Sequence, residues 1–177
     1  MSRSHKVTAI VGSTSSSSRT RVLVEAIVSS LASVRPIEVT WVELSTLAQH
    51  IGPVVSPAAL PPEGKAAIAA IEQSDLIIAA SPVYKGSYTG LFKHLIDFVH
   101  PEALVGRPVL LAATGGSDRH ALVVDQELRP LFGFFRSHTV PSAVFASDAD
   151  FDGQRLGSDA LLTRIHEAAG QAAALLA

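Results

Sequence analysis

Residues 81–90 form a polar stretch, Ser-Pro-Val-Tyr-Lys-Gly-Ser-Tyr-Thr-Gly, between two apolar patterns. The run before it, Asp75-Leu-Ile-Ile-Ala-Ala80, is short and continuous, which is typical of a buried strand. The run after it, residues 91–99, has the spacing of an amphipathic helix. A strand, a loop rich in Pro and Gly, and a helix in this order predict a ligand crevice at the carboxyl edge of an α/β sheet.

Both tyrosines of the chain, Tyr84 and Tyr88, lie in this loop. An aromatic ring exposed on a loop leaves a large apolar surface in water unless the ring covers something. We therefore expect the loop to cover a flat, conjugated ligand such as a flavin ring.

The alternation of strand and helix patterns continues through the whole chain. Residues 45–62 contain four prolines and predict a long loop or lid. An irregularity is expected before Pro130, which has no amide hydrogen for a helix. The predicted strands are 6–11, 37–43, 76–80, 108–113 and 140–145, and the predicted helices are 18–33, 63–73, 91–99, 118–135 and 156–176.

This alternation predicts an α/β protein with a doubly wound, five-stranded parallel sheet and helices on both faces. The strand order 2-1-3-4-5 is expected from general preferences of such folds, because periodicity does not determine it. The length of 177 residues is that of one domain, so we expect residues 1–177 to form a single domain.

The composition excludes several classes of function. Hydrophobic residues make up 47% and charged residues 17% of the chain, which favours buried parallel strands or a subunit interface. The net charge of −2, without a basic stripe, argues against nucleic acid, and no apolar run approaches the length of a membrane span. The absence of cysteine excludes disulfides, thiolate metal sites and a cysteine nucleophile, and it fits a cytoplasmic protein.

The loop after the first predicted strand is rich in hydroxyl groups. It runs Gly12-Ser-Thr-Ser-Ser-Ser-Ser-Arg-Thr20 into the first helix. Hydroxyls, backbone amides, an arginine and a helix N-terminus together predict a phosphate cradle. The alternative is a serine-rich turn in which Ser18 caps the helix. The loop has neither the Gly-Lys-Ser/Thr of a P-loop nor the G-x-G-x-x-G of a dinucleotide fold.

A third polar loop, Ala113-Thr-Gly-Gly-Ser-Asp-Arg-His120, follows the fourth predicted strand. Paired glycines let the backbone approach a ligand closely, and Thr114 and Ser117 can hydrogen-bond to a heterocycle. The alternative is an ordinary Gly-rich turn, but the fold would bring three polar loops to one edge. His120 lies in this loop and is a candidate ligand contact.

Two other kinds of site have little support. A Ser-His-Asp hydrolase would need a G-x-S-x-G elbow, which the chain lacks. His94 and Asp97 are three residues apart and could pair on a helix surface, but a metal site needs a further ligand. We therefore expect no metal.

The three loops resemble those of the NAD(P)H-dependent FMN reductases, a family with a flavodoxin-like fold. The resemblance rests on Gly12-Ser13 with Ser18-Arg-Thr20, on Pro82-Val-Tyr-Lys85 with Tyr88 and Gly90, on Ala113-Thr-Gly-Gly-Ser117, and on residues 120–130. It is strongest to the reductase components of two-component alkanesulfonate and methanesulfonate monooxygenases.

The resemblance implies an FMN site and a set of roles. FMN would receive hydride at N5 from NADPH or NADH, so that no acid or base residue is required. Ser13, Ser18, Arg19 and Thr20 would bind the FMN phosphate. Pro82, Val83, Tyr84, Lys85 and Tyr88 would wrap the ribityl chain and the ring, and Thr114, Gly115, Gly116 and Ser117 would line its pyrimidine side.

Two departures from the family pattern have consequences. Many relatives carry an arginine where this chain has Ser15, so Arg19 would bear most of the phosphate charge and FMN would bind more weakly. Gln126 stands where related reductases insert a residue that forms a π-bulge, and it is a possible modulator together with His120. The resemblance also implies a homo-oligomer, either a dimer or a tetramer.

We therefore expect a reductase that supplies reduced FMN to a partner monooxygenase of the sulfonate or organosulfur type. One alternative is an NAD(P)H:quinone or azo oxidoreductase with tightly bound FMN. A second alternative is a flavodoxin-like electron carrier, although such carriers tend to be strongly acidic.

Overall fold

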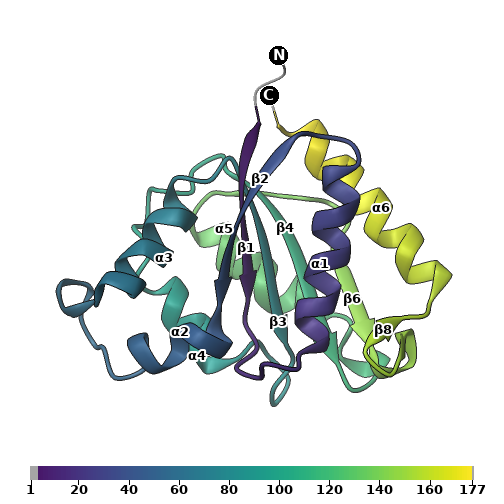
Figure 1. The fold of residues 1–177 in the computed structure, drawn as a ribbon, viewed down its shortest axis with the longest axis horizontal. Helices are drawn as coiled ribbons and strands as arrows, with labels where there is room; N and C mark the ends of the chain where they lie inside the picture. Colours follow the sequence, from purple (N-terminus) through teal and green to yellow (C-terminus); the bar gives the residue numbers. More distant parts are fainter. Residues whose placement is uncertain (1–3, 177) are drawn as a thin grey trace.

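The computed structural model describes residues 4–176 (Figure 1). A parallel sheet runs through the centre in the order β2-β1-β3-β4, followed by a fifth position that two short strands share. This order confirms the predicted flavodoxin-like topology. The strands of the sheet are β1 (His5–Val11), β2 (Ile37–Glu43), β3 (Leu76–Pro82), β4 (Pro108–Gly115), β5 (His138–Thr139) and β6 (Val144–Ser147).

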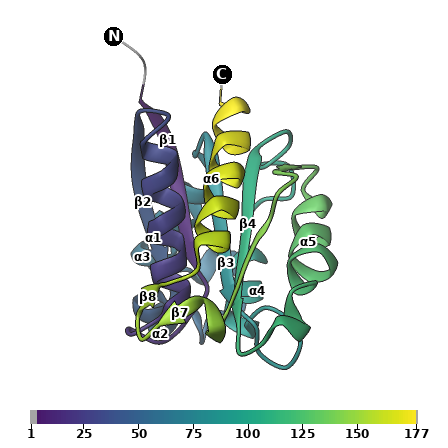
Figure 2. The same cartoon turned by 90° about the vertical axis from the view of Figure 1, so that its right-hand side faces the viewer.

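Helices cover both faces of the sheet (Figure 2). Side chains alternate along β3, so that Ile77 and Ala79 join one buried cluster while Ile78 and Ala80 join the other. The cluster containing Ile78 is closed by α1 (Arg19–Ala32) and α6 (Asp159–Ala174). The opposite cluster is closed by α2 (Leu44–Ile51), α3 (Pro62–Glu72), α4 (Gly90–Ile96) and α5 (Arg129–Phe134).

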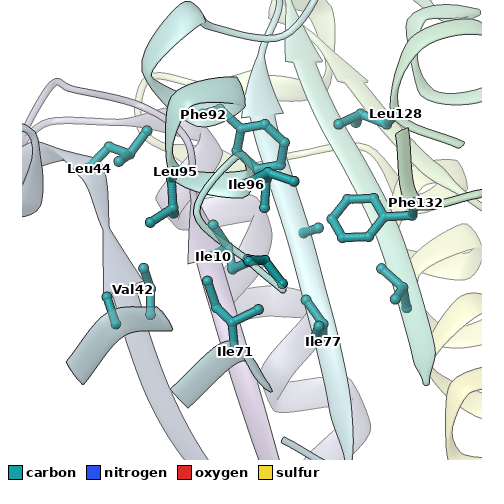
Figure 3. Close-up of a cluster of buried hydrophobic side chains, with 14 of the residues drawn as sticks. Ile10, Val42, Leu44, Ile71, Ile77, Phe92, Leu95, Ile96, Leu128 and Phe132 are labelled. Atoms are coloured by element: carbon teal, nitrogen blue, oxygen red, sulfur yellow. The ribbon is translucent and has the colours of Figure 1, made fainter. Parts of the chain in front are cut away.

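Two phenylalanines anchor the second cluster (Figure 3). Phe92 of α4 and Phe132 of α5 are fully buried, and they pack with Ile10 and Ile77 of the central strands. Burial of side chains of this size contributes about 1.5–3 kcal/mol each relative to exposure. Because Phe92 lies in the first turn of α4, its burial also fixes where the preceding loop ends.

The predicted loop at 45–62 is wrong in its first half. Residues Leu44–Ile51 form α2, and Leu44, Leu47 and Ile51 are buried at helical spacing. A short 3-10 helix, Pro57–Ala59, follows. The prolines begin only at Pro53, so they do not prevent a helix before that position.

The fifth strand is also not continuous as predicted. The segments β5 and β6 both pair with β4, but residues 140–143 between them lie outside the strands. Pro141 falls in this gap, and proline cannot donate a ladder hydrogen bond.

The last helix begins three residues later than predicted. Residues Phe151–Asp152 (β7) and Arg155–Leu156 (β8) form a small antiparallel hairpin, and Ser158 caps α6 by accepting from the Leu161 amide at 3.2 Å. The predicted helix at 118–135 divides into a 3-10 turn, Asp118–His120, a π-helical turn, Val124–Leu128, and α5. The irregularity expected before Pro130 is thus confirmed.

Arg129 ties the interrupted fifth strand to α5. Its guanidinium donates to Thr139 Oγ1 at 2.9 Å, to the Val140 carbonyl at 3.0 Å and to the Pro141 carbonyl at 3.2 Å. It also pairs with Asp125 at 2.8 Å. These bonds satisfy carbonyl groups that the broken strand leaves without a partner.

We expect Arg129→Ala to lower the free energy of unfolding by about 1–3 kcal/mol, because several acceptors lose a charged donor. Urea unfolding followed by circular dichroism measures this change. Arg155→Ala, at an exposed arginine of β8, is the matched control and should stay within about 0.5 kcal/mol of the wild type. Equal losses in the two variants would contradict the role given to Arg129.

Candidate functional site: a crevice at the carboxyl edge of the sheet

Three loops that follow β1, β3 and β4 meet at the carboxyl edge of the sheet, the lower edge in Figure 1. The Gly12 amide donates to the Ala80 carbonyl at 2.7 Å, which joins the first loop to β3. The Val83 amide donates to the Thr114 carbonyl at 2.7 Å, which joins the second loop to β4. The three polar stretches of the sequence therefore form one continuous surface.

The first loop leads into α1 with its amides exposed. Ser13 is buried and its Oγ accepts from the Ser15 amide at 3.2 Å, while Ser18 caps α1 by accepting from the Arg21 amide at 3.4 Å. Among residues 4–176, the amides of Ser16 and Ser17 donate to no protein acceptor. Free amides at a helix N-terminus favour an anion, so this geometry fits a phosphate group.

Thr20 and Arg19, at the start of α1, already have protein partners. The Thr20 hydroxyl is buried and lies 2.7 Å from Thr114 Oγ1, so it links the first loop to the third. Arg19 Nη1 forms an ion pair with Asp148 at 2.6 Å. The arginine expected to bear the phosphate charge thus shares that charge with a carboxylate.

The second loop contains a tight hairpin at its tip. Tyr84 and Ser87 exchange backbone hydrogen bonds of 2.9 and 3.2 Å. Between them, Lys85 and Gly86 both have positive φ, at 53° and 85°, as a type I′ turn requires. Tyr84 remains 53% exposed at the crevice, whereas Tyr88 is partly buried against Phe92 with ring centroids 5.9 Å apart. Only one of the two tyrosines is therefore free to cover a ligand.

The two glycines of the third loop have different surroundings. A Cβ on Gly115 would lie 2.9 Å from Phe145 Cζ and 3.4 Å from His120 Cβ, so a side chain there would clash. A Cβ on Gly116 would meet nothing within 4 Å. The Ser117 hydroxyl accepts from Arg119 Nε at 3.0 Å. Gly115 is thus required for packing, and Gly116 borders open space.

An open cavity of about 170 Å³ lies where the three loops meet. Known ligand pockets are typically about 300–1,000 Å³, so this crevice would enclose only part of a ligand of FMN's size. It is lined by seven of the predicted site residues, namely Arg19, Pro82, Val83, Tyr84, Thr114, Gly115 and Gly116. The cavity is not lined by the other six predicted residues, which are Ser13, Ser18, Thr20, Lys85, Tyr88 and Ser117.

Sequence reasoning missed three lining residues, Ala146, Asp148 and Phe151. They lie in β6, in the 3-10 turn Asp148–Asp150 after it, and in the first strand of the hairpin that follows. One local signal was available, because Ser147 and Asp150 form a capping box in which the Ser147 amide donates to Asp150 Oδ2 at 2.8 Å. The contact between Asp148 and Arg19 spans 129 positions and has no local signal.

The π-helical turn lies beside the second loop. Gln126 is part of this turn, as the resemblance implies, and its side chain is exposed. Its neighbour Glu127 accepts from the Ser87 hydroxyl at 2.9 Å, so the turn holds the tip of the second loop. His120 is half-buried behind Gly115.

His94 and Asp97, which could have paired, do not, since Asp97 pairs with Lys93 and His94 bonds to the Ile51 carbonyl at 3.0 Å. Within residues 4–176, no group of three His, Asp or Glu side chains gathers as a metal ion would need. Among the helices of the described part, none is long and apolar enough to cross a membrane.

Comparison with known proteins adds to this geometry. Residues 5–152 match the family model described as NADPH-dependent FMN reductase. The chain is 50% identical over 175 residues to the NADH-dependent FMN reductase SfnF of Pseudomonas fluorescens, covering 99% of this chain and 94% of that protein. It is 47% identical over 175 residues to an FMN reductase (NADPH) of Pseudomonas aeruginosa, with the same coverage.

Solved structures agree with the fold. An oxidoreductase of Corynebacterium diphtheriae superposes with a TM-score of 0.87 at 33% identity and covers 98% of both chains. The apo form of an NADH:FMN oxidoreductase (EMOB) gives a TM-score of 0.86 at 28% identity, covering 98% of this chain and 91% of that one. The chain therefore belongs to the NADPH-dependent FMN reductase family, oxidoreductases that use FMN together with a reduced nicotinamide nucleotide.

Proposed function

We propose that this protein reduces FMN with NADH or NADPH and releases the reduced flavin to a separate monooxygenase. The observation that carries the proposal is the shallow crevice, whose backbone walls are tied together while its cover, Tyr84, stays exposed. A ligand in this crevice would keep one side open to solvent. A relative named as SfnF, an NADH-dependent FMN reductase, supports the reaction.

The residues around the crevice would contact different parts of FMN. The free amides before α1, with Ser13, Ser18, Arg19 and Thr20 around them, would hold the FMN phosphate. Pro82, Val83, Tyr84, Lys85 and Tyr88 would form the wall along the ribityl chain and ring, and Thr114, Gly115, Gly116 and Ser117 would face the pyrimidine edge. Bound FMN would supply the redox chemistry by accepting hydride at N5.

The protein itself would position the flavin and leave one face of the ring accessible to the nicotinamide. The wall formed by Val83 and Thr114 is held by their 2.7 Å backbone bond, so the flavin would be placed against a rigid surface. The open side would leave room for the nicotinamide ring to stack. We propose that residues 1–177 act as one FMN-binding domain, with Gln126 and His120 as modulators next to the site, in the cytoplasm where NADH and NADPH are produced.

The kinetic test uses flavin-free protein and measures NADH and NADPH oxidation at 340 nm while FMN is titrated. Because FMN is proposed to be a substrate, we expect turnover that saturates with free FMN well above the enzyme concentration. Turnover that needs only one FMN per chain plus a quinone would contradict the release of flavin. It would favour a bound-flavin oxidoreductase instead.

A variant at Gly116 tests whether the crevice is the flavin site. Because a Cβ there would meet nothing within 4 Å, Gly116→Val should fold normally yet fill the space proposed for the flavin. We expect FMN affinity, measured by quenching of flavin fluorescence, to fall about tenfold or more, a loss of about 1.4 kcal/mol or more.

Gly170→Val, in α6 on a different part of the surface, is the matched control, since a Cβ there also meets nothing within 4 Å. It should bind FMN as the wild type does. Unchanged FMN binding by Gly116→Val would place the flavin elsewhere.

We also propose that the protein is a homo-oligomer, a dimer or a tetramer, in which a second copy covers the groove between α4 and α5. The groove has a volume of about 470 Å³ and is lined mainly by apolar side chains, among them Leu131, Phe134 and Phe135. Phe134 is 68% exposed, which is unusual for a ring of this size on a free surface. Only Lys93 and Asp97 add charge there, and they pair with each other.

Phe134→Asp should therefore dissociate the oligomer, because it puts a charge in an apolar contact. Light scattering coupled to gel filtration measures the mass, and Phe134→Leu is the control that should keep the assembly. A wild-type protein that runs as a monomer at all concentrations would exclude the proposed interface.

A further inference from the structure

Arg19 makes three contacts with the segment that follows β6. Its Nη1 donates to Asp148 Oδ1 at 2.6 Å, its Nε donates to the Gly153 carbonyl at 3.4 Å, and its guanidinium lies 5.2 Å from the centre of the Phe151 ring. A guanidinium has five N–H donors. Two of its three nitrogens are thus already engaged by protein oxygens before any ligand binds.

The segment that holds Arg19 is itself fixed. Asp150 Oδ2 accepts from the Ser147 amide at 2.8 Å, and the Gly157 amide donates to the Asp150 carbonyl at 2.9 Å. Phe151 and Leu156 pack against the buried cluster beneath α1 and α6. Asp148 therefore sits on an ordered turn, and its carboxylate is presented to Arg19 in a defined position.

Both members of this ion pair line the crevice. Arg19 is the first residue of α1, beside the free amides proposed to hold the flavin phosphate. A phosphate bound there would meet a guanidinium already paired with a carboxylate, and it would also lie near that carboxylate's negative charge. Two anions, one belonging to the protein and one to the ligand, compete for the same cation.

We propose that Asp148 lowers the affinity of the site for the FMN phosphate, and so reduces its preference for FMN over riboflavin. Its carboxylate pairs with Arg19 while the crevice is empty. When FMN binds, the guanidinium would divide its hydrogen bonds between this carboxylate and the FMN phosphate. FMN affinity is thereby kept low enough for the flavin to leave after reduction. This inference rests on the proposed function, because it concerns the same phosphate site.

The pair is not required for the fold. The Arg19 side chain is 34% exposed and that of Asp148 is 61% exposed, and ion pairs this exposed to water contribute little to stability. The remaining contacts of the segment, those of Asp150, Phe151 and Leu156, do not involve Asp148. Asp148→Asn therefore removes a charge without removing the turn.

The test compares FMN with riboflavin, which lacks the phosphate. The dissociation constants of both are measured by quenching of flavin fluorescence for the wild type and Asp148→Asn. We expect Asp148→Asn to bind FMN about two- to fivefold more tightly, the range of an exposed ion pair, and to bind riboflavin unchanged. Addition of Arg19→Met should remove most of this gain, because the two substitutions act on one contact.

Asp152→Asn is the matched control. Asp152 is an exposed carboxylate in the hairpin that follows the turn of Asp148, and within residues 4–176 no hydrogen bond or ion pair joins it to Arg19, so its substitution changes the net charge equally. An equal gain in this variant would mean a general charge effect and would overturn the proposal. An unchanged or higher ratio of the FMN to riboflavin dissociation constants in Asp148→Asn would also overturn it.

Failure of the proposed function has a different signature. A wild-type protein that binds neither flavin and oxidises no NAD(P)H in its presence overturns the function, and this inference falls with it. Normal flavin binding with no response to Asp148→Asn overturns this inference alone.

Discussion

The close approach of β1 to β3 at Gly12 is the constraint on which the rest of the site depends. The Gly12 amide bonds to the Ala80 carbonyl at 2.7 Å, and a Cβ on Gly12 would lie 2.9 Å from both that oxygen and Phe92 Cδ2. The Thr89 hydroxyl donates to the Gly12 carbonyl at 2.9 Å and accepts from the Phe92 amide at 3.2 Å, which caps α4. One residue without a side chain thus joins the end of β1, the end of β3 and the start of α4. Any larger residue would separate the two loops that begin there.

A second buried tie extends this arrangement to the third loop. Thr114 accepts from the Val83 amide through its carbonyl and meets the Thr20 hydroxyl through its own side chain, both at 2.7 Å. The walls of the crevice are therefore fixed before a ligand arrives, which lowers the entropy that binding must overcome. The groups around the opening, such as Tyr84 and Gly116, are exposed instead. A preformed wall with an open side suits a ligand that binds and leaves repeatedly.

Sequence reasoning found the strands and the three loops because their signals are local, and it took the strand order from the general preferences of the fold class. Apolar runs end in polar, glycine-containing stretches, and the fold class brings parallel strand ends to one edge. It missed α2 because the four prolines of 45–62 outweighed the helical spacing of Leu44, Leu47 and Ile51. It missed the gap in the fifth strand, although Pro141 marks it. Contacts between distant residues, above all Arg19 with Asp148, leave no trace in spacing or composition, so the carboxylate beside Arg19 could not be predicted.

The π-helical turn connects the cover of the crevice to the proposed oligomer face. Pro130 has no N–H, and the amide of Arg129 before it bonds to the Val124 carbonyl five residues back, as in a π-helix. The turn carries Glu127, whose carboxylate accepts from Ser87 at the tip of the second loop. Leu131 and Phe134, on the α5 helix that continues from this turn, line the apolar groove. A second copy seated on that groove would press on the same helix that holds the hairpin of Tyr84. The hairpin contact of Glu127 and the apolar groove would then share one irregular helix.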